Sequence, residues 1–130
     1  MKLHKLFAIS LMLCLFGTAI PLHAEDGNWK VGRIYYRMVC TACHTEHAGG
    51  AISPATMTKA EWKAYIAADK HAKGKDSVKY YVSQEYRNSI KDTNKAAAKF
   101  ASMPDEEMLA NVQAFVIHGA KDSDTPARCN

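Results

Sequence analysis

The sequence has no run of alternating apolar and polar residues long enough for a β-sheet strand, and its β-branched residues are scattered. It contains no internal repeat and no low-complexity tract. Its 130 residues carry a formal net charge of +4, yet no stripe of lysine and arginine is interleaved with stacking aromatics. A nucleic-acid partner is therefore not indicated. The patterning that is present has helical spacing, so we expect a small all-α domain.

Long apolar runs are also missing, except at the N-terminus. Two lysines precede the apolar run 6–20, Pro21 breaks this run, and Ala24 stands as a small residue before two acidic ones. This order is typical of a secretory signal peptide cleaved after Ala24. The run falls short of the ~20 residues that a bilayer span needs, which disfavours a retained membrane anchor. We predict a signal peptide over 1–24 and an exported mature chain, periplasmic or extracellular, without a membrane span.

Cysteine is scarce, with four in the whole chain, and Cys14 lies inside the predicted signal peptide. Cys40, Cys43 and Cys129 would survive cleavage. An odd number in an exported chain argues against a pure disulfide framework. Cys129 is then a free thiol, a small-thiol adduct, or a bridge that joins two copies or attaches the chain to a larger assembly.

Two helices are predicted in the first half of the domain. Apolar residues at helical spacing predict the first over about Trp29 to Cys43. Thr58 and Glu61 fit a capping box that opens the second, which we expect to end near Gly74. The apolar face of the first helix is expected to consist of Val31, Ile34, Tyr35, Met38 and Val39.

The second half is predicted to be helical as well. "VKYYVSQEYRNSI" and "NKAAAKFA" are each compatible with a helix. Pro104 and three acidic residues suit the start of a last helix that ends by Gly119. We therefore expect one domain over 25–119 and a polar C-terminal tail over 120–130. The apolar face of the last helix is expected to be Met108, Val112, Phe115 and Val116.

Cys40, Cys43 and His44 form a C-x-x-C-H motif at the end of the first predicted helix. Structural zinc needs four ligands, usually as two spaced pairs, and there is no second C-x-x-C or H-x-x-x-H. A thioredoxin-type dithiol opens a helix after a buried strand, whereas this pair closes one. Two thiols one turn apart can instead add to the vinyl groups of a porphyrin, with His44 as an axial ligand. We favour one covalent haem c with its iron, and keep zinc and dithiol as alternatives.

The stretch "GRIYYRMVCTACH" resembles the N-terminal helix of the class I cytochrome c family, in which a glycine and an aromatic precede C-x-x-C-H. Gly32 and Tyr36 occupy these two positions. "PDEEMLANVQAFVIHG" resembles the closing helix of the family, with Val112 and Phe115 at the matching positions. The resemblance spans about 28–119, and its specific motifs lie at the two ends. It implies a small cytochrome c-like fold, whose first and last helices pack across one haem with Tyr36 against Phe115.

The resemblance also implies a role for Pro54, which lies ten residues after His44. The family commonly has a proline here, and its carbonyl accepts the ring N–H of the proximal histidine. Such an interaction fixes the orientation of the ligand. We therefore expect a hydrogen bond from the His44 ring to the Pro54 carbonyl.

The distal ligand of the iron has several candidates. The family usually supplies a methionine before the last helix, and Met103 matches that pattern. His71, at the end of the second predicted helix, precedes the loop expected over the distal face, and we prefer it. Met57 and His118 are weaker candidates, and the distal site could also be open.

The predicted function is electron transfer, in which one haem passes one electron between redox protein partners without acting as an enzyme. A haem-based sensor or peroxidase-like enzyme with an open distal site is one alternative. A haem subunit of a larger electron-transfer assembly is another. Lysines between residues 59 and 79 are either a docking patch for an acidic partner or simply solvated.

Overall fold

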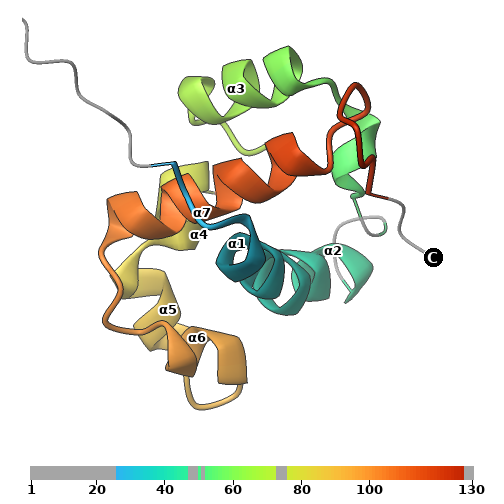
Figure 1. Ribbon diagram of the computed structural model, residues 1–130. Helices are drawn as coiled ribbons and strands as arrows, with labels where there is room; N and C mark the ends of the chain where they lie inside the picture. The colour runs from blue at the N-terminus through green and yellow to red at the C-terminus, as the bar shows by residue number, and fades with distance from the viewer. Residues whose placement is uncertain (1–25, 47–49, 51, 73–75, 128–130) are drawn as a thin grey trace, which may run out of the picture.

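The computed structural model describes residues 26–46, 50, 52–72 and 76–127, and this part of the chain is helical without a β-strand (Figure 1). The prediction of an all-α chain is confirmed. In the same residues, no helix is both long and apolar enough to cross a membrane. The predicted signal peptide over 1–24 and Cys129 lie outside the described residues.

The first helical stretch is longer than predicted and changes its winding in the middle. It consists of α1 (Trp29–Tyr35), a π-helical turn η1 (Tyr36–Cys40) and α2 (Thr41–Glu46). Asn28 begins it, because its side-chain oxygen accepts the backbone N–H groups of Lys30 and Val31 in the first turn of α1. A π turn inside a helix shifts the direction of every later side chain, and such turns are frequent at functional sites. Here the turn ends at the first cysteine of the C-x-x-C-H motif.

The last helix, α7 (Asp105–His118), crosses α1 at very short range (Figure 1). A Cβ added at Gly32 would lie 1.9 Å from the backbone oxygen of Asn111, so only glycine allows this approach. Tyr36 packs against Phe115 with ring centroids 5.3 Å apart. Both contacts were expected from the sequence and are confirmed.

The expected apolar face of α1 and η1 is only partly correct. Tyr35 and Val39 are buried, but Ile34 and Met38 are 40% and 50% exposed. The face that packs on α7 is centred on Gly32, because the close crossing brings the backbones together there. Residues three and seven positions after this glycine point inward, whereas Ile34 and Met38 lie on the neighbouring face.

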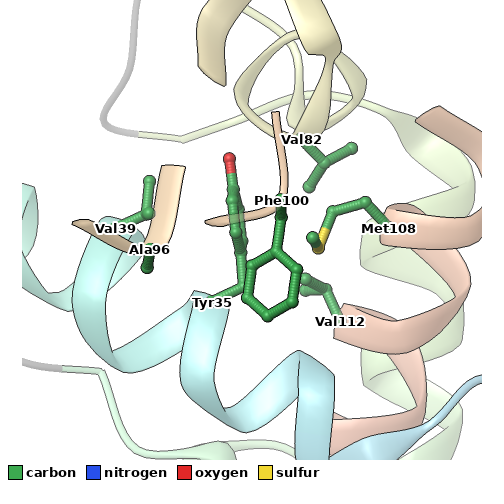
Figure 2. Packing of buried hydrophobic residues seen from close by; sticks show 7 residues of the cluster. All are labelled: Tyr35, Val39, Val82, Ala96, Phe100, Met108 and Val112. Carbon is green, nitrogen blue, oxygen red and sulfur yellow. The ribbon is translucent and has the colours of Figure 1, made fainter. Parts of the chain in front are cut away.

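The core consists of two clusters, and α7 contributes residues to both. The predicted apolar face of α7 is fully confirmed. In the first cluster, α1 and η1 meet α7 and the helices of residues 78–100 (Figure 2). In the second, α3 (Lys59–Ala68) packs on α7. The first cluster is Tyr35, Val39, Val82, Ala96, Phe100, Met108 and Val112. The second is Trp62, Ile66, Phe115, Val116 and Ala120.

Helix α3 (Lys59–Ala68) begins with the predicted capping box, in which Thr58 and Glu61 bond to each other's backbone N–H groups. Its predicted end near Gly74 is wrong. The helix stops at Asp69, which adopts the left-handed conformation with φ 51°. Aspartate tolerates this conformation better than most side chains, and a left-handed residue ends a helix.

Three short helices, α4 (Val78–Val82), α5 (Gln84–Ile90) and α6 (Lys95–Lys99), follow. The segment expected as one helix is divided by Ser83, whose extended ψ of 156° ends α4 and whose hydroxyl caps α5. The next expected helix is confirmed, and Asn94 caps it.

The residues after Gly119 pack on the body of the domain, although they were expected as a polar tail. Ala120 is fully buried, and a Cβ on Gly119 would approach that of Pro54 within 3.0 Å. This tail, residues 120–127, is therefore fixed to the segment that leads into α3. Its hydrogen bonds run from Ser53 Oγ to the Ala127 carbonyl, from Lys121 N to the Met57 carbonyl, and from Lys59 N to Asp122 Oδ1.

Candidate functional site

A cavity of about 260 Å³ lies between η1, α2, α3, α4 and α7. Its wall is mainly aliphatic and aromatic, so a ligand would be held largely by apolar contacts. The polar exceptions are the residues that the sequence singled out. Cys40, Cys43, His44 and His71 all line this cavity.

His44 reaches the cavity from α2 and is 8% exposed. Its buried Nδ1 atom makes no hydrogen bond in the described part of the chain. Burial lowers the pKa of this imidazole, because the charged form loses its hydration. The ring is therefore held neutral, which is the form that binds a metal ion.

Cys40 and Cys43 form no disulfide with each other and differ in exposure. Cys40 is half-buried, and burial, together with the nearby Cys43, raises the pKa of its thiol to about 12. Cys43 is exposed at the edge of the cavity. One turn of helix separates the two sulfurs, so a single planar ligand can be reached by both.

His71 enters the same cavity from the loop after α3, and its ring centroid lies 5.7 Å from that of His44. Its Nδ1 is also buried and makes no hydrogen bond to the described residues. Burial is the main cause that lowers the pKa of His71, and the neighbouring His44 contributes to the same shift. The cavity thus holds two neutral imidazoles whose rings approach one another across an apolar space.

The remaining distal candidates divide into two groups. Met57 lines the cavity, but Met103 and His118 are not among its lining residues. The Met103 sulfur accepts a long hydrogen bond of 3.5 Å from the Asn111 side chain, and the residue packs on the first core cluster. His118 stacks on Trp29 at 4.1 Å.

The expected hydrogen bond between His44 and the Pro54 carbonyl is not formed. This carbonyl accepts the indole N–H of Trp62 at a distance of 2.7 Å, and His44 Nδ1 is without a partner in the described residues. Trp62 is buried, so its N–H requires an internal acceptor, and Pro54 is within reach. The contact therefore links Pro54 to α3 and not to the motif helix.

Sequence reasoning missed the aromatic residues around His71. Tyr81 lies against the His71 ring at 5.0 Å and also contacts Tyr80 and Tyr86, with ring centroids 5.1–5.6 Å apart among the three tyrosines. The concentration of tyrosine in this segment was visible in the sequence. Their convergence was not, because it depends on the break at Ser83.

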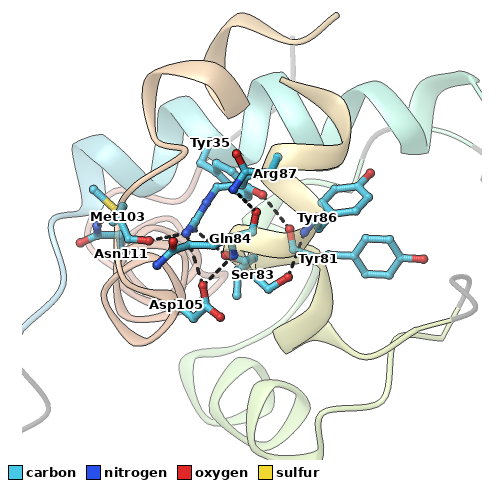
Figure 3. A network of polar contacts seen from close by, with 11 residues as sticks. Tyr35, Tyr81, Ser83, Gln84, Tyr86, Arg87, Met103, Asp105 and Asn111 are labelled. Atoms are coloured by element: carbon cyan, nitrogen blue, oxygen red, sulfur yellow. Dashed lines mark hydrogen bonds and ion pairs between the residues drawn. The ribbon is translucent and has the colours of Figure 1, made fainter. Parts of the chain in front are cut away.

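Arg87 was also missed, and it is fully buried. It donates to the Val82 carbonyl at 2.6 Å and to the Met103 carbonyl, and lies 3.4 Å from Asp105 (Figure 3). Burial lowers its pKa, whereas Tyr35 and Asp105 oppose this shift. Arg87 therefore joins the end of α4 to the segment that opens α7, and it holds the wall that carries Tyr81 and Val82.

Two thiols on one helical turn and two neutral imidazoles in one apolar cavity fit a flat, mostly apolar macrocycle with a metal at its centre. The described residues suit a bare metal ion less well. The part of the chain that the structure describes has no cluster of three or more His, Cys, Asp or Glu side chains suited to hold one. A structural zinc site needs four such ligands.

The chain matches no protein-family model, and no curated protein or solved structure shows significant similarity to it. Its functional interpretation depends on the motif and on the geometry of the cavity.

Proposed function

We propose that this protein is a one-electron carrier with one covalently attached haem c, which acts outside the cytoplasm between redox protein partners. The observation that carries the proposal is the meeting of Cys40, Cys43, His44 and His71 at one apolar cavity. When bound, the haem would supply an iron centre that alternates between the ferric and ferrous states. We also propose the export that residues 1–24 predict.

A small class I cytochrome c-like arrangement is part of this proposal. Its support is the crossing of α1 and α7 at Gly32 and the contact of Tyr36 with Phe115. Both contacts lie next to the motif helix, so they fix its direction relative to the cavity. The two cysteines are thereby held on one edge of the space that the ligand would fill.

We assign His44 as the proximal ligand and His71 as the distal ligand. Both are neutral, both line the cavity, and each has a buried ring nitrogen without a hydrogen bond in the described residues. The two ring centroids lie 5.7 Å apart at this cavity, so a metal held between the rings could be bound by both imidazoles. Met103, whose sulfur contacts Asn111, is the less favoured ligand. Two imidazoles give a lower reduction potential than an imidazole and a methionine.

The remaining wall would exclude water from the metal. Val82, Val112 and Val116 are nearly fully buried and line the cavity beside the aromatic rings of Trp62 and Tyr36. Such a wall gives the ferric and ferrous states nearly the same surroundings, which suits electron transfer. Cys43 is exposed, so the edge of the site near this residue is the natural contact for a partner.

Absorption spectra of the purified protein, oxidised and reduced, with and without carbon monoxide, test the proposal. We expect a low-spin spectrum without the far-red band of sulfur–iron ligation and with, at most, slow binding of carbon monoxide. His71→Ala should become high-spin and bind carbon monoxide. The matched variant Met103→Leu should keep the wild-type spectrum, because Met103 does not line the cavity.

Three results would contradict parts of the proposal. A far-red band that disappears in Met103→Leu would exclude His71 as the ligand. Rapid carbon monoxide binding by the wild type would favour the sensor or peroxidase-like alternative. Absence of haem bands, or haem that acidified solvent extracts from the wild type, would exclude covalent attachment through Cys40 and Cys43.

A further inference from the structure

We infer that Asp69 and Tyr65 are positioning residues that hold His71 at the cavity through its backbone. The inference rests on the proposed function, in which His71 is the distal ligand. It starts from the His71 ring, whose buried Nδ1 makes no hydrogen bond to the described residues. A ligating histidine is usually oriented by a hydrogen bond at its second ring nitrogen. Here the orientation has to come from the backbone and from the contact with Tyr81.

Asp69 connects the end of α3 to the start of α4, and His71 lies between these two helices in the chain. It is the one non-glycine residue with a positive φ in the described part of the chain, and it turns the backbone out of α3 two residues before His71. Its Oδ1 atom accepts the backbone N–H of Lys79 at 2.8 Å, in the first turn of α4. The same side chain therefore ends one helix and binds the next, across ten residues.

Tyr65 holds the loop from the side of α3. Its hydroxyl oxygen accepts the backbone N–H of Ala72 at 3.2 Å, directly after His71. Its ring packs edge-on against Trp62, which is buried and bonded to Pro54. The backbone on either side of His71 is thus attached to α3, at Asp69 through the chain and at Ala72 through this hydrogen bond.

Substitutions at Asp69 and Tyr65 can remove these contacts one at a time. Asp69→Asn keeps both the tolerance of a left-handed backbone and an acceptor for Lys79. Asp69→Gly keeps the backbone conformation and removes the acceptor. Asp69→Ala removes both. Tyr65→Phe removes only the acceptor for Ala72, since the ring is retained.

The test measures carbon monoxide binding to the reduced holoprotein and the ferric high-spin fraction of each variant. Because each loosened attachment raises the population in which His71 has left the metal, we expect binding about tenfold faster or more in Asp69→Ala. A smaller increase is expected in Asp69→Gly and Tyr65→Phe, and none in Asp69→Asn. Hydrogen exchange should show lost protection of the Lys79 amide in Asp69→Ala and Asp69→Gly.

Asp122→Ala is the matched control. Asp122 Oδ1 accepts the backbone N–H of Lys59 at 2.8 Å, which is the same type of bond at the opposite end of α3. Denaturant unfolding should show a loss of stability like that of Asp69→Gly, without faster carbon monoxide binding. If Asp69→Ala does not fold, Asp69→Gly and Tyr65→Phe carry the same comparison.

The inference is overturned if Asp122→Ala accelerates carbon monoxide binding as much as Asp69→Gly does, since the effect would then be general loosening. It is also overturned if His71→Ala binds carbon monoxide while the Asp69 and Tyr65 variants behave as wild type. If His71→Ala itself changes nothing, the ligand assignment under the proposed function fails, and the positioning role fails with it.

Discussion

His44 and His71 reach the same cavity from two kinds of support. His44 lies on a helical stretch that begins at Trp29 and crosses α7 through close backbone and apolar contacts. His71 lies on a loop that polar contacts hold to α3 and α4. The helical side derives its rigidity from packing, which many residues share. The loop side depends on single hydrogen bonds, so one substitution can release it.

The same contrast extends through the domain. Around α1 and α7, most of the stabilising contacts are between small or apolar residues at helical spacing, with one hydrogen bond from the Asn28 amide to the Asn111 side chain. In the segment that connects α3 to α7, the described residues are held to one another by specific hydrogen bonds, including those of the buried Arg87 guanidinium. Substitutions on the two sides should therefore fail in different ways.

Gly32→Ala should have the largest effect, because it separates α1 from α7. The added methyl group would lie 1.9 Å from a backbone oxygen of Asn111 that cannot move independently. We expect a loss of about 4 kcal/mol in the free energy of unfolding, or no folded protein. Denaturant unfolding of the holoprotein measures it, with Ile34→Ala on the exposed face as the control. Equal losses in the two variants would show that the crossing is not the critical contact.

Arg87→Ala should have the next largest effect, on the loop side. It would leave the Val82 and Met103 carbonyls without their donor and leave a cavity where the fully buried arginine side chain had been. A cost of about 3 kcal/mol is expected in thermal or denaturant unfolding. Asp105→Asn is the control, because Asp105 is 47% exposed and should cost below about 1 kcal/mol. A larger cost for Asp105→Asn than for Arg87→Ala would contradict the importance of the two carbonyl contacts.

Trp62→Phe tests the contact that replaced the expected one at Pro54. The substitution removes the buried indole N–H and leaves the Pro54 carbonyl without this donor. We expect a loss of about 2 kcal/mol in unfolding free energy. The low-spin spectrum should persist, because neither histidine loses a hydrogen bond. A high-spin spectrum in this variant would show instead that Trp62 helps to hold an axial histidine, through Pro54 or through its contact with Tyr65.

Tyr35→Phe should have the smallest effect at neutral pH, because it removes one hydrogen bond between the two sides. The Tyr35 hydroxyl donates to the Tyr81 carbonyl at 2.6 Å, so the expected loss is about 1 kcal/mol (Figure 3).

The same variant should be less sensitive to alkali than the wild type. Burial, with a contribution from Cys40, raises the pKa of Tyr35 above its ordinary value. Above pH ~10, the unfolded chain releases this proton while the native protein retains it, so wild-type stability falls as pH rises, by up to about 1.4 kcal/mol per pH unit. Denaturant unfolding at pH 8 and pH 11 measures the difference. Parallel losses in the wild type and Tyr35→Phe would assign the alkaline sensitivity to other groups, such as Tyr86.

The helical side of the molecule was largely predictable from the sequence. The apolar face of α7, the capping box of Thr58 and the approach at Gly32 depend on local spacing or on one short motif. The π turn at Tyr36–Cys40 was not predictable, because the buried residues Tyr35 and Val39 stand four positions apart, as they would in an unbroken α-helix.

The loop side was predictable only in part. His71 was identified as a candidate, but its supports were not, because each joins residues that local patterns do not relate. The left-handed conformation of Asp69, which ends α3, could not be predicted without its hydrogen bond to the Lys79 amide, and no local pattern relates these two residues. A buried arginine resembles a surface arginine until the carbonyls around it are placed. Polar contacts between distant residues are the part of a fold that composition and periodicity do not encode.

The meeting of α1 and α7 also sets an order of events during synthesis. The Asn28 amide donates to the Asn111 side chain across 83 residues, and Tyr36 meets Phe115 across a similar separation. Contacts between such distant segments form late in folding, because the loop between them has to close first. Until α7 has been made, the helix that presents Cys40 and Cys43 lacks its main partner. Under the proposed function, the two thiols would consequently stay reachable for attachment of the haem until α7 has been made.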